Sequence, residues 1–335
     1  MVAETTPPST QTAKAPPPLV PVNCNYCGAD DYEVVANVSA DHEYVGVLDD
    51  AYAMRPFRFV RCRGCGLTYL NPRPDDEEIL KYYPPEYGCF AQCPPKGIMM
   101  RALYRVMVAL KRRELLPRLP QDGVLLDFGC GNGHWLASLK PFAGPKQRLI
   151  GIDPCREPIE ALRAKGVEAY VGGEDNLLEL IEPESVDLIL FNHVIEHVPD
   201  PKRTLRRLAE VLKPGGEIRG VTPNVDAWDR RLMGAWWAGW HAPRHFILFD
   251  REMLERYAAQ ADLKLIATRY ELEGANHWSV SWHNWLARKL NWRASTGHYR
   301  MPIYPLLLLP ALGLGGLQKV FSKTSVIGFV MRKAD

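Results

Sequence analysis

The residues Val124-Leu-Leu-Asp-Phe-Gly-Cys-Gly-Asn-Gly133 form an apolar run that ends in an acid and a GxGxG turn. Glycines after a buried strand let the backbone turn tightly and approach a ligand. A helix expected from about His134 to Lys140 would point its free N–H groups at the same ligand. The pattern predicts an α/β protein with a nucleotide-cofactor loop, whose glycines are Gly129, Gly131 and Gly133.

The acid in this run indicates which cofactor the loop accepts. Asp127 lies two residues before Gly129, where its charge would repel the diphosphate of a dinucleotide. S-adenosylmethionine (SAM) carries an ammonium and a sulfonium and no phosphate, so a carboxylate here favours SAM over NAD. The next expected strand, Arg148-Leu-Ile-Gly-Ile-Asp153, ends on a second carboxylate, which can accept both ribose hydroxyls.

Further motifs follow in order along the chain. Ser185-Val-Asp-Leu-Ile-Leu-Phe-Asn192 is nearly all apolar and predicts a buried parallel strand. It leads into His193-Val-Ile-Glu-His-Val-Pro-Asp-Pro201, and Leu212-Lys-Pro-Gly-Gly216 precedes another expected strand, Glu217–Thr222. Such an ordered series argues against a glycine turn that merely links a strand to a helix.

At these residues the chain resembles the class I SAM-dependent methyltransferases. The resemblance is to the branch with an EHVPDP segment and an LKPGG turn, which includes the ubiquinone-pathway O-methyltransferases and many sugar methyltransferases, and it covers roughly Leu115 to Leu272. It implies a Rossmann-like, seven-stranded methyltransferase sheet, expected within residues 121–335, and SAM as cofactor. The expected SAM-binding residues are Asp127, Gly129, Gly131, Gly133, Asp153 and Asn192.

The EHVPDP segment supplies the first candidate catalytic residues. An enzyme that transfers a methyl group to a hydroxyl must align that hydroxyl and remove its proton. We expect His193 to be the general base, because imidazole titrates near neutrality, with Glu196 and His197 beside it. In the resembled ubiquinone-type enzymes an acid at this position can hold a divalent cation with the Glu-His pair; a histidine there disfavours Mg²⁺. Alternatively, Glu196 and His197 brace the helix expected near Pro201.

A second candidate cluster lies in Trp236-Trp-Ala-Gly-Trp-His-Ala-Pro-Arg-His-Phe246. Members of the resembled group often have a similar Pro-x-His element beside the acceptor pocket. His245 is therefore a catalytic candidate, Arg244 could contact an acidic or hydroxylated acceptor, and His241 is a weaker candidate. The alternative is that these side chains only fix a loop through hydrogen bonds.

Two CxxCG knuckles near the amino terminus predict a metal site. Four soft ligands in this arrangement suit a closed, tetrahedral zinc site that stabilises a small domain. The expected zinc ligands are Cys24, Cys27, Cys62 and Cys65. Within the resembled family, methyltransferases with an amino-terminal zinc-ribbon-like module are known. A disulfide or redox pair is the alternative, and Cys89 and Cys93 are expected to be unliganded.

Local composition and charge predict the division of the chain into segments and its location in the cell. Residues 1–21 are expected to be a disordered tail, 22–75 the zinc-ribbon-like module, and 76–120 a linker with an amphipathic helix from Ile98 to Leu119. The formal charge of +2 gives no basic excess for nucleic acid, so a nucleic-acid partner is not expected. No secretory signal is evident, which predicts a cytoplasmic protein.

An insertion is expected between the last two strands, Leu263–Tyr270 and Ser325–Arg332. It spans residues 273–324 and holds Trp278, Trp282, Trp285 and Trp292 near helical spacing, followed by the apolar segment Pro302–Leu317. A Trp-rich face with basic flanks suits peripheral contact with the inner face of a membrane. A lid over an apolar acceptor and packing onto the protein's own core are the alternatives.

Together these features predict a SAM-dependent methyltransferase with structural zinc. We expect O-methylation of a small or lipid-linked apolar acceptor, such as a quinone-like phenol or a sugar hydroxyl. C-methylation of a nucleotide sugar is the first alternative. In the second, the zinc ribbon binds RNA or a protein partner and a macromolecule is methylated.

Overall fold

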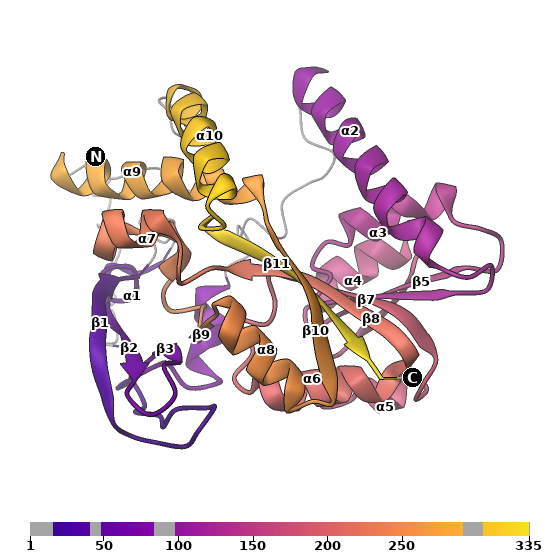
Figure 1. Cartoon of the computed structure of the whole chain (residues 1–335), viewed down its shortest axis with the longest axis horizontal. Coiled ribbons are helices and arrows are strands. Elements are labelled where there is room, and N and C mark those ends of the chain that lie inside the picture. Colours follow the sequence, from indigo (N-terminus) through magenta and orange to yellow (C-terminus); the bar gives the residue numbers. More distant parts are fainter. Residues whose placement is uncertain (1–15, 41–47, 84–97, 291–303, 335) are drawn as a thin grey trace, which may run out of the picture.

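Two β-sheets form the core of the protein, in a computed structural model that describes residues 16–40, 48–83, 98–290 and 304–334 (Figure 1). The larger sheet has seven strands in the order β10-β11-β8-β7-β4-β5-β6. The five strands from β8 to β6 in this order are mutually parallel, and β11 runs antiparallel to both β8 and β10. This confirms the expected Rossmann-like, seven-stranded sheet. The strands are β4 (Val124–Phe128), β5 (Arg148–Asp153), β6 (Glu168–Val171), β7 (Val186–Asn192), β8 (Leu212–Pro223), β10 (Leu263–Tyr270) and β11 (Val326–Lys333).

The central strands lie inside the molecule because helices cover both faces of the sheet. Every residue of β4 is buried, as its unbroken apolar run requires. At the start of α6 (Pro201–Val211), Asp200 accepts hydrogen bonds from the backbone N–H groups of Lys202 and Arg203, so the helix begins where it was expected. The other helices that cover the sheet are α3 (His134–Leu139), η5 (Lys140–Phe142), α4 (Arg156–Arg163), α5 (Leu177–Leu180) and α8 (Arg251–Ala259).

The smaller sheet joins the amino-terminal module to the rest of the chain. Its order is β1-β2-β3-β9, with β1 (Tyr32–Ser39), β2 (Pro56–Cys62), β3 (Thr68–Leu70) and β9 (Ile247–Leu248). Strand β9 comes from far along the chain, and Ile247 pairs with Tyr69. Two short helices accompany these strands: α1 (Asp50–Ala53) lies between β1 and β2 in the sequence, and η2 (Glu78–Tyr82) follows β3.

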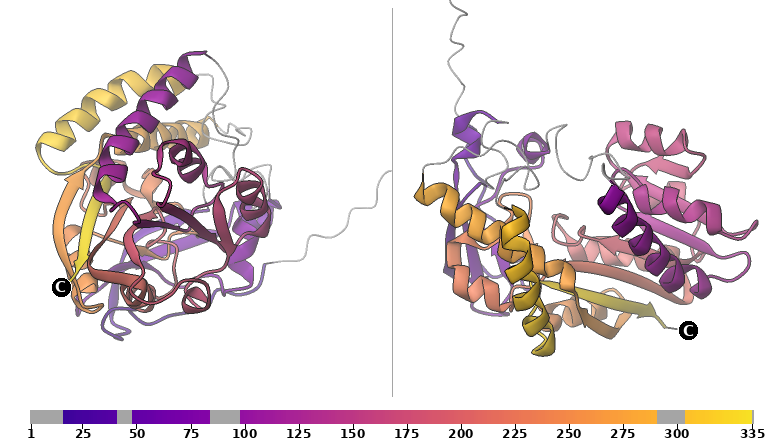
Figure 2. Two further views of the ribbon diagram at one scale, coloured as in Figure 1. Left: turned by 90° about the vertical axis from the view of Figure 1, so that its right-hand side faces the viewer. Right: turned by 90° about the horizontal axis from the view of Figure 1, so that it is seen from above.

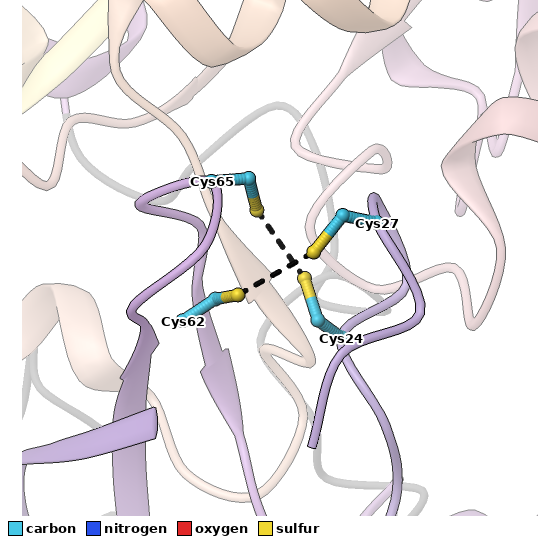
Figure 3. Close-up of side chains that lie close together, drawn as sticks. All are labelled: Cys24, Cys27, Cys62 and Cys65. Carbon is cyan, nitrogen blue, oxygen red and sulfur yellow. Dashed lines mark hydrogen bonds between the residues drawn. The ribbon is translucent and has the colours of Figure 1, made fainter. Parts of the chain in front are cut away.

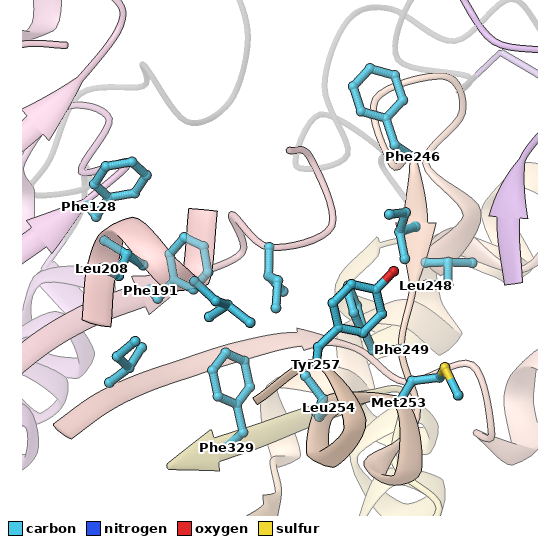
Figure 4. Packing of buried hydrophobic residues seen from close by; sticks show 14 of the residues in the cluster. Phe128, Phe191, Leu208, Phe246, Leu248, Phe249, Met253, Leu254, Tyr257 and Phe329 are labelled. Atoms are coloured by element: carbon cyan, nitrogen blue, oxygen red, sulfur yellow. The ribbon is translucent and has the colours of Figure 1, made fainter. Parts of the chain in front are cut away.

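One hydrophobic core runs through both sheets. Phe59 of β2 packs against Trp240 with a ring separation of 4.7 Å, and Phe249 packs against Tyr257 at 5.4 Å. Figure 4 shows Tyr257 and Leu254 of α8 next to Phe249, with Phe191 and Phe329 of the larger sheet farther along the same cluster. The amino-terminal module therefore shares its core with the larger sheet.

The insertion forms two helices, α9 (Ala275–Lys289) and α10 (Tyr304–Val320), after the short turn η8 (Leu272–Gly274). Trp278 is buried and donates a hydrogen bond from Nε1 to Gln318 at 2.8 Å, whereas Trp285 is 43% exposed. Trp292 lies outside the described residues. The tryptophans therefore do not share one exposed face. None of the described helices is long and apolar enough to cross a membrane.

The segment before β4 differs from expectation in two places. The long helix α2 (Ile98–Leu115) ends earlier than Leu119, and η4 (Leu116–Arg118) follows it with Pro117 in its first turn. Its apolar residues Val106 and Leu110 are more than half exposed, so α2 does not bury an apolar face in the way that an amphipathic helix usually does. The remaining short helices are α7 (Trp228–Met233), η6 (Gly234–Trp236) and η7 (Ala238–Trp240).

Most of the expected disordered tail, residues 1–15, lies outside the described residues, as do Cys89 and Cys93. The end of that tail is ordered, because Val20 and Arg73 exchange backbone hydrogen bonds at 2.8 and 3.0 Å. Ordered structure thus begins before residue 22.

Candidate active site and zinc centre

The glycine loop follows β4 and has the predicted conformation. Gly129, Gly131 and Gly133 all have positive φ angles, between 53° and 72°, which residues with a side chain rarely adopt. A Cβ on Gly133 would lie 2.2 Å from Leu162 Cδ2, and one on Gly129 would lie 2.6 Å from Val194 Cγ2. The second contact places the loop directly against the residue that follows His193.

Two carboxylates flank this loop, as predicted. Asp153, at the end of β5, accepts hydrogen bonds from the backbone N–H of Gly131 at 2.8 Å and of Cys155 at 2.9 Å. Each of its oxygens keeps a second lone pair. Ribose binding by Asp153 therefore stays a prediction, alongside its role in holding the loop.

Asp127 is 5% exposed, and burial raises the pKa of its carboxyl to about 7, against a smaller opposite effect of Lys111. A cationic ligand would favour the ionised form of such a buried carboxyl. The carboxyl of Asp127 therefore fits the positive charges of SAM. Lys111 was not predicted to act here; it lies on α2, and only the fold brings it near β4.

The carboxyl end of β7 carries the candidate base. Asn192 ends the strand, and His193 follows in the left-handed region with φ 52°. His193 Nδ1 lies 3.2 Å from Glu196 Oε1, and Thr222 donates a hydrogen bond to Glu196 Oε2 at 2.9 Å. The side chain of His193 is 36% exposed, whereas that of Glu196 is fully buried. A buried carboxylate thus orients a histidine that a ligand can reach.

Glu196 is ionised although it is buried. Burial alone would raise the pKa of its carboxyl, but the hydrogen bond with His193 and the nearby imidazoles outweigh burial and hold that pKa below its ordinary value. When Nδ1–H of His193 donates to Glu196, Nε2 is left without a proton and can accept one. Thr222 was expected only as the end of a strand, and its residue type alone gave no signal for this role.

His197 and His245 pack against each other with a ring separation of 4.7 Å. His197 Nδ1 lies 3.0 Å from the Arg244 carbonyl, and His245 Nδ1 lies 2.9 Å from the Gly239 carbonyl. Because a carbonyl oxygen only accepts hydrogen bonds, each imidazole carries its proton on Nδ1, and neither Nε2 atom is protonated. Burial lowers the pKa of His197 to about 4 and that of His245 well below its ordinary value, so both are neutral at pH 7.

The fold thus brings together the two segments in which candidate histidines were predicted, that of His197 and that of His245. His241 Nδ1 lies 3.3 Å from His245 Nε2, and Arg244 Nη2 contacts His241 Nε2. Arg244 is fully buried, and its guanidinium carbon lies 5.8 Å from the centre of the Tyr83 ring. The hydroxyl of Tyr83 lies 3.1 Å from His197 Nδ1, a contact that the linker expected over residues 76–120 did not specify.

The ligand atoms of Glu196, His197 and His245 lie within 4.8 Å of one another, so these residues could hold a cation. Two imidazole nitrogens and one carboxylate favour a transition metal over Mg²⁺.

The four predicted cysteines converge in the amino-terminal module (Figure 3). Cys24 and Cys65 sulfurs lie 3.4 Å apart, and those of Cys27 and Cys62 lie 3.5 Å apart, too far for a disulfide. Four sulfurs about 2.3 Å from one zinc ion would be separated by about 3.8 Å, so the cluster is compatible with tetrahedral zinc. Burial raises the pKa of Cys62, but hydrogen bonds from the backbone N–H of Cys65 and from the Cys27 thiol outweigh burial and lower that pKa to about 7.

The cysteine module also contacts the α6 and α8 side of the larger sheet. Tyr257 of α8 donates a hydrogen bond to Asn25 Oδ1 at 3.0 Å, and Arg256 donates to the Cys65 carbonyl at 3.1 Å. Asn25 also contacts Asp200, the residue that caps α6. The cysteine module is thereby fixed to the domain that carries His193 and His245.

Comparisons with known proteins identify the family of this domain. A family model described as a methyltransferase domain matches residues 100–268, half of the chain. A ubiquinone biosynthesis O-methyltransferase of Serratia proteamaculans is 30% identical over 121 residues, which cover 34% of this chain and 49% of that protein. A 37.1 kDa protein of transposon TN4556 from Streptomyces fradiae is 35% identical over 107 residues, 30% of each chain.

The chain thus spans about half the length of the first of these relatives and less of the second. Among solved structures, a geranyl diphosphate C-methyltransferase from Streptomyces coelicolor A3(2) aligns with a TM-score of 0.49 and 14% identity, covering 74% of this chain and 84% of that one. With a GxGxG loop, two flanking carboxylates and the matching family model, the chain belongs to the methyltransferase-domain family and contains a class I SAM-dependent methyltransferase domain.

Proposed function

We propose that the protein transfers a methyl group from SAM to a hydroxyl of a small or lipid-linked apolar acceptor. The observation that carries this proposal is the pair formed by His193 and the buried, ionised Glu196 at the end of β7. The pair adjoins the cofactor loop, since Val194 lies against Gly129. A hydroxyl acceptor needs such a base, because oxygen becomes a strong nucleophile only as it loses its proton.

The chain's residues would act in a defined order. Asp127, Asp153 and the glycine loop would hold SAM, which supplies an electrophilic methyl group when bound. As the acceptor oxygen takes the methyl group from SAM, His193 Nε2 would accept the proton of that hydroxyl. Glu196 stabilises the resulting imidazolium through Nδ1–H, and Thr222 holds the carboxylate in place. The neutral His245 and the buried Arg244 line the side on which we place the acceptor.

The test uses His193→Asn as the decisive variant. Asparagine tolerates a positive φ, and its Nδ2 can replace Nδ1 in the hydrogen bond to Glu196, but it has no second nitrogen to act as base. With methyl-labelled SAM and a panel of phenols and sugars, we expect turnover to fall about 100-fold or more. The affinity for S-adenosylhomocysteine, measured by calorimetry, should change by less than about threefold.

The same assay distinguishes the alternatives. Product NMR separates an O-methyl from a C-methyl group, and label in RNA or protein fractions of a lysate would identify a macromolecular acceptor. Equal turnover by His193→Asn and the unchanged protein would contradict the base assigned here.

We further propose that the four cysteines hold a structural zinc ion, because such a site is closed to water and stabilises a small module. Thiolate ligands persist in a reducing compartment, which supports a cytoplasmic location for the enzyme. Nucleic acid is not proposed as a partner, since the formal charge of +2 gives no overall attraction to phosphate.

A further inference from the structure

Helix α10 carries its large apolar side chains on the outside. Leu306 and Leu309 are 74% and 75% exposed, and Val320 is 77% exposed. The inner face is made of Ala311, Gly315 and Gln318, which are buried. A helix at a water-exposed surface normally has the reverse pattern, with its large apolar residues toward the core.

Close contacts with α9 and with Asp229 fix the orientation of α10 about its own axis. A Cβ on Gly315 would lie 2.6 Å from Ala275 Cβ, so no larger residue fits at this crossing. Gln318 accepts a hydrogen bond from Trp278 and donates one to Asp229 at 2.9 Å. Rotating α10 to bury its leucines would break these contacts.

Helix α2 adds positive charge to more exposed apolar surface. Ile98 is 91% exposed and Leu110 is 61% exposed, while Arg101 and Arg105 are also exposed. No acidic residue occurs in the sequence from Ile98 to Arg113. The cations of this helix are Arg101, Arg105, Lys111, Arg112 and Arg113.

The two helices lie on one side of the molecule. Figure 1 shows α10 and α2 rising from the same side of the sheet, and in the left-hand view of Figure 2 both helices extend to the top of the molecule. The insertion also reaches the active-site loop, because Ser281 of α9 accepts a hydrogen bond from the Ala238 backbone N–H at 2.9 Å. Ala238 lies three residues before His241, in the segment that carries His245.

We propose that α10 and α2 dock the protein on the surface of a bilayer with anionic headgroups. The leucines of α10 enter the boundary between headgroups and acyl chains, and the arginines of α2 contact lipid phosphates. A second copy of the chain is a poorer occupant, because a two-fold interface through this surface would bring the α2 cations of both copies together. This proposal does not depend on the identity of the methyl acceptor.

The test is flotation of the full chain with vesicles of phosphatidylcholine, with and without phosphatidylglycerol. We expect binding only to the anionic vesicles, and weaker binding as salt is raised. Replacing two cations in Arg101→Gln/Arg105→Gln should weaken binding about 25-fold, since each contributes roughly fivefold near an anionic surface. Leu306→Asn/Leu309→Asn should weaken it at least about tenfold.

Matched controls come from equally exposed residues elsewhere. Leu232→Asn on α7, where Leu232 is 73% exposed, and Arg156→Gln on α4 should each bind within about twofold of the unchanged protein. All variants change exposed side chains, so their thermal unfolding should match that of the unchanged protein.

Three results would overturn the proposal. The first is no binding to either vesicle, and the second is equal binding to neutral and anionic vesicles. The third is a stable dimer, seen by light scattering, that Leu306→Asn/Leu309→Asn dissociates.

Discussion

Replacing Asp127 with asparagine should change stability and cofactor affinity in opposite directions. Burial raises the pKa of this carboxyl from 3.8 to about 7, so the ionised form is disfavoured in the folded protein. At about 1.4 kcal/mol for each pKa unit, the folded state without cofactor loses about 4 kcal/mol at pH 8. Asp127→Asn removes that cost, and the free energy of unfolding should rise by up to about 4 kcal/mol.

The sign of the pH dependence follows from the same pKa. Below pH 3.8 the carboxyl is protonated in both the folded and the unfolded chain, and it costs nothing. Between pH 3.8 and about 7 the unfolded chain ionises first, so this group makes stability fall as pH rises. Urea unfolding at pH 5 and pH 8 should show this fall in the unchanged protein and a smaller fall in Asp127→Asn.

Cofactor binding should respond the other way. A charged hydrogen bond between Asp127 and the ammonium of S-adenosylhomocysteine is worth about 1.5–3 kcal/mol, so the variant should bind roughly 10- to 150-fold more weakly by calorimetry. Asp153→Asn is the matched control, because Asp153 accepts N–H bonds from Gly131 and Cys155 and its loss should lower stability and affinity together. A destabilised Asp127→Asn, or one with unchanged affinity, would refute the charge argument.

Two further outcomes test the zinc module and the buried network under α10. Cys62→Ser should lose bound zinc by elemental analysis and unfold at a lower temperature, whereas Cys155→Ser, outside the cluster, should keep its zinc; zinc retained by Cys62→Ser would contradict the assignment. Asp229 is fully buried and accepts hydrogen bonds from Trp237 at 2.7 Å, Ser325 at 2.5 Å and Gln318 at 2.9 Å, so Asp229→Ala should lower the free energy of unfolding by about 3 kcal/mol in urea. The half-exposed Asp226→Ala should cost less than about 1 kcal/mol, and equal effects would show that burial does not set the difference.

The cofactor half of the site was predictable because its information is local. A buried strand, an acid and glycines at fixed spacing specify a turn, and Gly129 and Gly133 have the positive φ angles that this turn needs. The CxxCG knuckles are local in the same sense. Each pair of cysteines is set by one short turn, and only the meeting of the two pairs requires the fold.

The acceptor half was less predictable, because its partners are distant in the chain. Thr222 reaches Glu196 only because β8 pairs with β7, and Tyr83 reaches His197 although the two residues are 114 positions apart in the sequence. A Trp-rich face of the insertion was expected to contact a membrane, with a lid or core packing as alternatives. Trp278 is buried and hydrogen-bonds to Gln318, whereas the leucines of α10 face outward. Helical spacing gives the period of a face but not the direction in which it points.

The sequence by itself determined the class of sheet, the cofactor loop, the cysteine pairs and the candidate base, since short-range backbone geometry and charge encode each of them. Only the tertiary structure decided that the cysteine module shares its core with the larger sheet, that Glu196 is buried and ionised beside His193, and which side of α10 meets the outside. Those features depend on burial and on contacts between distant segments, and such contacts exist only once the chain has folded.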